Sequence, residues 1–198
     1  ADAAAHALAL VHQRHQLVSG LEFERNRRID GKTTLIDGVA QLTEFGENLE
    51  ASSRRDAFYG QDEWSITPQW AVHAGLRVES ITTRGEGANG IIDVNSSRVA
   101  TPLLHTVWKF NETSRDQVRA SLTRSYRSPN LGQLIGRPSV SRTDAAPGAI
   151  TELTADSAGN PTLKPEVAIG IDLAIERYLA DGGVLSANLF HRRINDLI

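Results

Sequence analysis

Three arginines on a long polar stretch are the residues best suited to bind a ligand: Arg127, Arg137 and Arg142. A guanidinium can hold a carboxylate or phosphate through two parallel hydrogen bonds, and a group of guanidiniums attracts anions over a longer range. The stretch from residue 127 to Lys164 is rich in glycine, proline, serine and threonine. The arginines are therefore candidates for anion binding, and ordinary solvated loop charge is the alternative.

The other reactive side chains do not form a catalytic constellation. Asp62 and Glu63 are adjacent, so in a strand they point to opposite faces and cannot act as a paired acid and base. No serine stands in a G-x-S-x-G context, and cysteine is absent. We predict that the chain is not an enzyme and carries no covalently bound cofactor.

The histidines do not predict a metal site. His12 and His15 lack a third ligand nearby, and a strand through both would place them on opposite faces. Three further histidines are predicted to stand singly in strands: His73, His105 and His191. We expect polar roles on a wet or interfacial surface for them.

Composition narrows the class of protein. The chain has 198 residues and a formal net charge of -3, with basic and acidic residues interspersed along its length. A nucleic-acid partner is therefore not predicted. The apolar runs are all shorter than the roughly 18 to 20 residues of a transmembrane helix. Alternating strands with polar loops would not be detected by that test.

Segments of period two dominate the chain, and their connections alternate between short turns and long loops. The predicted strands are 16–25, 55–66, 70–83, 102–110, 117–126, 167–176 and 185–190. In 70–83, Val72, Leu76 and Val78 share one face, whereas His73 and Arg77 share the other. This alternation, with short turns and long loops between the segments, predicts an all-β fold. The expected architecture is an antiparallel up-and-down transmembrane β-barrel segment of about eight strands.

Three motifs carry more specific information. The first runs Ala57-Phe-Tyr-Gly-Gln-Asp-Glu-Trp-Ser-Ile-Thr-Pro-Gln-Trp-Ala-Val-His-Ala-Gly-Leu-Arg77. The second is the strand with Ser121, Arg124 and Tyr126 and its exit Arg127-Ser-Pro129, and the third is Asn160-Pro-Thr-Leu-Lys-Pro-Glu166. Proline ends a ladder because it lacks the donor that a continuing strand needs, so the long loop has stiff borders.

In order and spacing, these motifs resemble the C-terminal part of the β-barrel of TonB-dependent outer-membrane receptors of the siderophore-receptor type. The resemblance covers residues 1–198 as a partial barrel domain, and we expect the plug domain, the signal peptide and the final strands to lie outside it. The residues that carry the resemblance are Gln61, Trp64, Trp70, Gly75, Arg77, Arg127, Pro129, Asn160, Pro161, Pro165 and Glu166.

The resemblance implies an active-transport receptor for a scarce solute, most often a ferric siderophore, energised by TonB in the outer membrane of a Gram-negative bacterium. The implied partners are outer-membrane lipid and lipopolysaccharide, a small-molecule ligand, and the TonB complex through an N-terminal part. The loop arginines would then meet an anionic iron complex or lipopolysaccharide. Trp64 and Trp70, which flank a short turn, fit the aromatic girdle of such a barrel.

Other functions fit the same pattern. Haem, cobalamin or a glycan would replace the siderophore within the family, and a passive porin shares the barrel. A different class is a soluble or surface β-sheet binding module, which predicts that neither sheet face meets lipid. The barrel interpretation instead predicts that the aliphatic face of residues 167–175 meets lipid, and that an open sheet of this kind has two unpaired edges.

Overall fold

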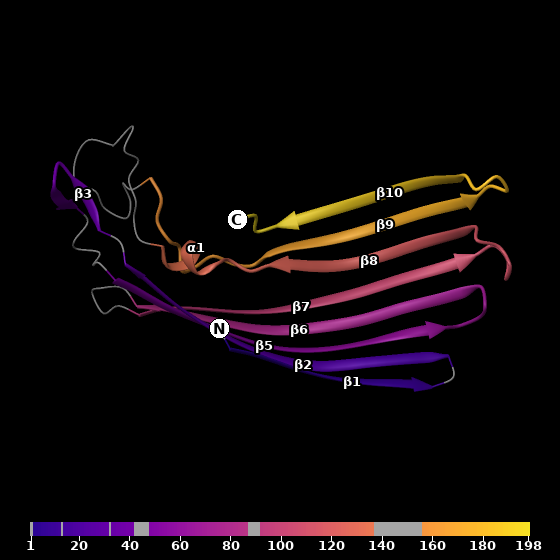
Figure 1. Cartoon of the computed structure of the whole chain (residues 1–198), viewed down its shortest axis with the longest axis horizontal. Coiled ribbons are helices and arrows are strands. Elements are labelled where there is room, and N and C mark those ends of the chain that lie inside the picture. The colour runs from indigo at the N-terminus through magenta and orange to yellow at the C-terminus, as the bar shows by residue number, and fades with distance from the viewer. Residues whose placement is uncertain (1, 13, 32, 42–47, 87–91, 137–155) are drawn as a thin grey trace.

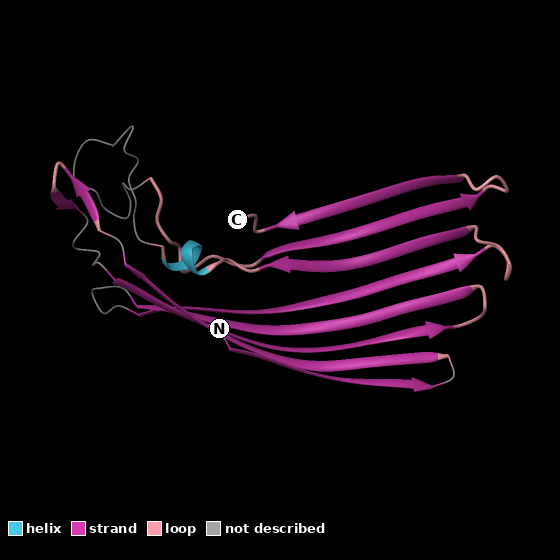
Figure 2. Ribbon diagram, in the orientation of Figure 1, coloured by secondary structure: helices cyan, strands magenta, loops and turns pink. Residues whose placement is uncertain are grey.

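The chain forms a long twisted sheet of β-strands (Figure 2). The structure is a computed structural model that describes residues 2–12, 14–31, 33–41, 48–86, 92–136 and 156–198. In chain order the elements are β1 (Asp2–His12), β2 (His15–Gly31), β3 (Thr34–Ile36), β4 (Val39–Gln41), β5 (Asn48–Ser65), β6 (Trp70–Glu86), β7 (Ile92–Lys109), β8 (Gln117–Arg127), α1 (Leu131–Ile135), β9 (Glu166–Tyr178) and β10 (Val184–Asn195).

Within the described residues, eight strands form one antiparallel sheet in the order β1-β2-β5-β6-β7-β8-β9-β10, and β3 pairs only with β4. Each strand of the large sheet therefore pairs with its neighbour in the chain, apart from the small β3–β4 hairpin. Figure 1 shows the short turns gathered at one end of the sheet, and α1 and the β3–β4 hairpin toward the other. The sheet is open, with β1 and β10 at its edges, and the predicted all-β antiparallel fold is confirmed.

Local sequence explains the short turns. Thr67 and Trp70 exchange backbone hydrogen bonds of 3.1 and 3.2 Å around Pro68, which cannot donate to a ladder. Gly182 has a φ of 88°, the left-handed conformation that glycine adopts without a steric penalty. The β3–β4 hairpin turns at Asp37-Gly38, where both residues have positive φ, as a two-residue hairpin turn of this chemistry requires.

The outward face carries an apolar band that starts at the short turns. On β6 this band runs from Trp70 to Val78, and its middle row contains Leu104, Leu122 and Ile171 as successive cross-strand neighbours. Large apolar side chains on this face are about half exposed, including Leu122 at 48%. A transmembrane strand needs about 9 to 11 residues, and the band has that height. The apolar band is therefore the surface that suits lipid.

The longer strands continue past the apolar band toward the long connections. Beyond Val78, β6 turns Ser80, Thr82 and Arg84 outward, and none of the three is apolar. The neighbouring outward positions of β5 include Asp56. The outward face is thus suited to water in this part, which leaves the loop-side ends of the strands outside the band. No helix in the described ranges is long and apolar enough to cross a membrane.

The inner face holds the small core of the molecule. The buried apolar residues of the described chain are Ala51, Ala57, Ile81, Val99 and Leu134. The first four lie on the inner face of β5, β6 and β7, and Leu134 comes from α1. Small side chains on the strands leave room for the helix to lie against them. The core is thus located at the loop-side end, between α1 and the sheet.

The pairing of β7 with β8 stops early. The β6–β7 ladder extends to Glu86 and Ile92, whereas the β7–β8 register ends at Leu103 opposite Thr123. Above that point side chains bridge the two strands. Arg124 Nη1 donates a 2.7 Å hydrogen bond to the carbonyl oxygen of Ala100, which β8 leaves unpaired. We call this opening, from Ile92 to Pro102 along β7, the seam.

Several predicted strand limits were wrong. The strand predicted at 102–110 begins at Ile92, and the one predicted at 55–66 begins at Asn48. The strand β1 was not predicted, and α1 lies inside a segment that was interpreted as loop. The missed parts of β5 and β7 lie beyond the apolar band, where mostly polar outward residues remove the alternation of apolar and polar residues on which the prediction depended.

Candidate functional site

A short helix, α1, packs against the inner face of the sheet at its loop-side end. In α1, Asn130 Oδ1 accepts a 2.9 Å hydrogen bond from Gln133 N, and Gln133 Oε1 accepts one of 2.9 Å from Asn130 N, which is a capping box. Leu134 is 2% exposed. A Cβ atom on Gly85 would lie 2.3 Å from Ile135 Cγ2, so the absence of a side chain on β6 lets the helix seat.

The third sequence motif is tied to this helix and to β7. Asn160 N donates a 2.8 Å hydrogen bond to Gln133 O. From β7, Asn95 Nδ2 donates to the carbonyl oxygens of Pro161 and Leu163 at 2.6 and 3.0 Å. Segments that are distant in sequence thus form one layer over the inner wall, which we call the mouth layer: α1, Asn95 and residues 160–163.

The remaining residues of the second and third motifs border the mouth layer. Arg127 is exposed and lies opposite Glu166 at the paired ends of β8 and β9. Pro129 connects β8 to α1, and Pro165 directly precedes β9. Asn160 Oδ1 also closes a local turn, since it accepts a 2.9 Å hydrogen bond from Thr162 N. Two ligand candidates, Arg137 and Arg142, lie outside the described residues.

Below the mouth layer, ionised side chains on the inner face form a network. Arg77 contacts Glu22 at 2.6 Å and also binds Glu79. Arg55 binds Glu24 and lies 3.9 Å from Glu79. The Glu79 side chain is 4% exposed, so its charge depends on these partners. The network joins β2, β5 and β6, and it explains why an arginine ends the first motif.

The same network crosses the seam. The Tyr126 hydroxyl of β8 donates to Glu79 of β6, over the position of β7. Together with Arg124, this tyrosine holds β8 against the rest of the sheet where the backbone ladder has ended. Both residues belong to the second sequence motif. The motif therefore fastens the seam as well as ending the strand.

Two other residues of the first motif pack against each other. Gln61 of β5 is the cross-strand neighbour of Gly75 of β6 on the inner face. A Cβ atom on Gly75 would lie 3.1 Å from Gln61 Cβ and 3.3 Å from Leu103 Cγ. These distances are shorter than normal van der Waals contact. Glycine at position 75 therefore lets the side chains of Gln61 and Leu103 pack closely on the inner face.

The tryptophans of the first motif lie outward at the short-turn end. Trp64 stacks on the His15 ring at 5.3 Å, and Trp70 Nε1 donates a 2.8 Å hydrogen bond to Thr106 Oγ1. Their exposures are 42% and 43%. Tryptophan with an exposed ring and a satisfied N–H is typical of a membrane interface. The two rings thus lie outward at the short-turn end, and the aromatic girdle stays a prediction.

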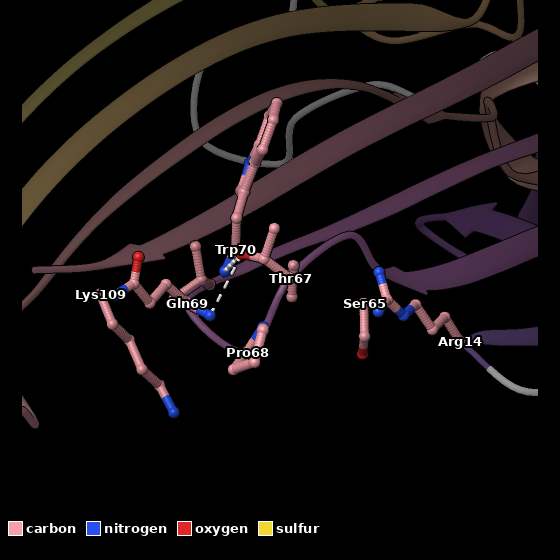
Figure 3. Close-up of a pocket in the computed structure, with 9 residues that line it drawn as sticks. Arg14, Ser65, Thr67, Pro68, Gln69, Trp70 and Lys109 are labelled. Atoms are coloured by element: carbon pink, nitrogen blue, oxygen red, sulfur yellow. Dashed lines mark hydrogen bonds between the residues drawn. The ribbon is translucent and has the colours of Figure 1, made fainter. Parts of the chain in front are cut away.

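Figure 3 shows a hollow beside this turn, lined by Arg14, Pro68, Trp70 and Lys109 among others. Arg14 Nη1 donates a 2.7 Å hydrogen bond to Ile66 O, which ties the β1–β2 turn to the next one. The hollow is bounded by the backbone of short turns. We assign it a structural role in joining neighbouring hairpins.

One ion pair lies beyond the apolar band on the loop side. Arg27 donates to both carboxylate oxygens of Glu50, at 2.7 and 2.8 Å. The hydrogen bonds from Arg27 lower the pKa of Glu50 below its usual value. Its stabilising effect is therefore present at neutral pH and is lost as the pH falls through that lowered pKa. Both side chains are well exposed, so the effect on stability is small.

The histidines differ from their prediction. His12 and His15 lie directly opposite each other across a turn rather than on opposite faces of one strand. His15 Nδ1 is 2.7 Å from Asp62 Oδ2. His73 and His105, predicted to stand singly, are direct cross-strand partners. Residues far apart in sequence meet here through the strand register, and no local sequence signal marks such a pair.

The outward face of the sheet thus carries the apolar band, and the inner face carries the ionic network and the mouth layer. The sequence matches the family described as "TonB dependent receptor-like, beta-barrel" over residues 2–198. The chain therefore belongs to this family, whose receptors are transporters of the Gram-negative outer membrane and not enzymes. No curated protein sequence matches the chain.

Solved structures with the same fold are receptors and transporters. The ferric-catecholate import receptor Fiu from E. coli K12 is 15% identical, with a TM-score of 0.64 over 97% of this chain and 31% of its own. The copper transporter OprC is 14% identical, with a TM-score of 0.70 over 98% of this chain and 30% of its own. The siderophore receptor PiuA from Acinetobacter baumannii is 15% identical, with a TM-score of 0.60 over 95% and 31%.

This chain thus spans about a third of the length of the structures that it resembles. The family membership sets aside a soluble or surface β-sheet binding module. Within the described residues, β1 and β10 are the unpaired edges of the sheet.

Proposed function

We propose that this chain is part of the barrel wall of an outer-membrane receptor that actively imports a scarce solute, with a ferric siderophore as the cargo and TonB as the source of energy. The proposal includes a plug domain, a signal peptide and closing strands outside residues 1–198. The observation that carries it is the mouth layer on the inner wall of a sheet whose outer face has a lipid-height apolar band, in a chain of this family.

The names of the similar structures support the choice of cargo. Fiu is a ferric-catecholate import receptor, PiuA is a siderophore receptor, and FecA is a ferric citrate transporter. Ferric complexes of this kind are anionic, so guanidinium groups near the mouth suit them. In the proposal Arg127, Arg137 and Arg142 contribute to that attraction from the loop after β8.

The partners follow from the two faces. The apolar band would meet lipid, with Trp64 and Trp70 at the headgroup level on the short-turn side. Exposed arginines beyond the band, such as Arg54 and Arg84, would meet lipopolysaccharide. TonB would act through a part of the receptor outside this chain, by pulling on the plug rather than on the wall described here.

An uptake assay tests the proposal. The protein is expressed in an iron-limited Gram-negative strain that lacks its own ferric-siderophore receptors, and uptake of radioactive iron is measured with catecholate, hydroxamate and carboxylate carriers. We expect uptake with one carrier class, abolished by deletion of TonB. In the variant Arg127→Ala we expect a weaker apparent affinity, by about tenfold or less, because the exposed arginine acts mainly through long-range attraction.

The matched control is Arg54→Ala, at an exposed arginine on the outward face of β5, which should leave the apparent affinity unchanged. Uptake that persists without TonB would contradict active transport and point to a passive porin. Absence of uptake with every ferric carrier, together with TonB-dependent uptake of haem, cobalamin or a glycan, would retain the receptor and reject the iron cargo.

A further inference from the structure

Two histidines lie side by side on the inner wall, toward the short-turn end. His73 of β6 and His105 of β7 face each other in the antiparallel register. Their ring centroids are 5.9 Å apart and their planes differ by 29°. His73 shares its face with Gly75 and Arg77, which places the pair on the same side as the ionic network. Nothing in the proposed import mechanism makes use of this pair.

One nitrogen of the pair has no assigned partner. His73 Nε2 is buried and has no hydrogen-bond partner within the described chain. Buried polar atoms are almost always satisfied, and an orphaned one calls for a water molecule or an ion. Neutral imidazole nitrogen is a good ligand for zinc, copper and nickel. The histidine pair therefore has donor atoms of a kind that binds a metal cation.

The geometry allows both rings to reach one cation. Directly opposed residues of an antiparallel pair have Cβ atoms about 4.5 to 5.5 Å apart. With metal–nitrogen bonds of about 2.0 to 2.1 Å, the centroids of two bound imidazoles come within about 5 Å of each other. The observed separation is larger and the two rings are stacked, so binding of one cation requires both side chains to rotate until their ring nitrogens converge.

The neighbouring positions of the same row suit a cation as well. Glu63 of β5 lies opposite His73, and its carboxylate is exposed. Ser121 of β8 lies opposite His105. The described residues contain no group of three histidine, cysteine or acidic side chains arranged to hold a metal, so water would complete the coordination shell. Two imidazoles are the whole set of direct ligands.

We propose that His73 and His105 form a two-histidine binding site for a divalent transition-metal cation on the inner wall of the sheet. The site lies below the mouth layer, close to the short turns. The proposal rests on the direct pairing of His73 with His105 and on the unpartnered Nε2 of His73. It does not depend on which solute the receptor carries. Copper(II) is the sharpest probe because it binds nitrogen ligands most tightly among the divalent first-row metals.

The test is a copper(II) titration of the untagged protein in detergent after removal of metals with a chelator. We expect one copper ion per chain, with an electron paramagnetic resonance spectrum that shows two nitrogen ligands. The variants His73→Asn and His105→Asn should each weaken binding by at least about tenfold and leave one nitrogen ligand, because the second imidazole binds intramolecularly. The matched control is His191→Asn, a histidine of the edge strand β10 opposite Ile171.

Equal copper affinity in the wild type and in the two pair variants would overturn the site and indicate an adventitious ion only. The same conclusion follows if the wild-type spectrum shows fewer than two nitrogen ligands, or if only His191→Asn loses the copper. Circular dichroism checks the fold of each variant. If a variant does not fold, protection of His73 and His105 from diethyl pyrocarbonate by copper in the wild-type protein decides, and lack of protection rejects the site.

Discussion

At the scale of single residues, Glu79 has the largest structural role. It is the buried carboxylate on which Arg77, Arg55 and the Tyr126 hydroxyl converge. Replacing it leaves two guanidiniums without one of their acceptors and releases the tyrosine of β8. Removal of one member of a partly buried ionic network typically costs several kcal/mol, and the cost is smaller here because Arg77 keeps Glu22 and Arg55 keeps Glu24.

We therefore expect Glu79→Ala to lower the free energy of unfolding by about 2 to 3 kcal/mol. The measurement is a guanidinium titration of the protein in lipid vesicles, followed by tryptophan fluorescence. Glu63→Ala is the matched control, since Glu63 is exposed on the same face and should change stability by about 0.5 kcal/mol or less. If the two substitutions lowered the free energy of unfolding equally, the ionic network around Glu79 would not stabilise the fold more than an exposed carboxylate does.

At the scale of elements, the seating of α1 depends on one glycine. Gly85→Val would force a side chain into the space of Ile135 and lift the helix away from β5 and β6. Losing the burial of Leu134 alone would remove on the order of 1.5 to 3 kcal/mol of stabilisation from α1. We expect the backbone amides of Gln133 and Leu134 to exchange at least about tenfold faster, measured by hydrogen exchange.

Gly60→Val controls for the added bulk, because a Cβ atom at Gly60 meets nothing within 4 Å. It should leave the exchange of α1 unchanged. Unaltered exchange of Gln133 and Leu134 in Gly85→Val would show that the helix does not depend on this contact, and that the hydrogen bonds from Asn160 and Asn95 suffice to hold the mouth layer.

The elements also show how far sequence reasoning reaches. The strand through Val72 and Arg77 was predicted with the correct faces, because one side carries the apolar band and the other carries polar and charged residues. The extension of β7 to Ile92 was missed, since beyond the apolar band neither face is constrained by lipid. The helix carries a signal that was overlooked: Asn130 followed three residues later by Gln133 is the pattern of a capping box.

The candidate site was only partly predictable for a related reason. The motif residues were named from the resemblance to the receptor family, and in the structure Pro129 follows the end of β8 and Gly75 packs on a neighbour. The contacts of Asn95 with Pro161 and of His73 with His105 depend on register and on a long loop that returns. Such pairings are set by the whole sheet, and no local period reveals them.

At the scale of the whole molecule, the apolar band predicts how the protein tolerates charge. Leu122→Arg would place a guanidinium in the middle row of the band, between Leu104 and Ile171. Near the bilayer midplane such a charge costs about 2 to 4 kcal/mol. We expect a decrease of that size in the free energy of unfolding in lipid vesicles, measured by the same guanidinium titration.

The comparison is Asn188→Arg, at an exposed inward position of β10 opposite Ala174, where the added charge remains in water. Its effect should stay below about 1 kcal/mol. If both substitutions were equally mild, the outward face would not be in contact with lipid, and the orientation of the sheet in the membrane would have to be reversed or abandoned.

The seam divides the loop-side half of the wall into two leaves. One leaf comprises β2, β5, β6 and the upper part of β7, and the other comprises the upper parts of β8 and β9. No backbone ladder joins the two leaves above Leu103. There they are connected by the side-chain hydrogen bonds of Arg124, Tyr126 and Asn95. Release of those bonds would therefore free the loop-side part of β8 from β7, while the pairing of the two strands below Leu103 remains.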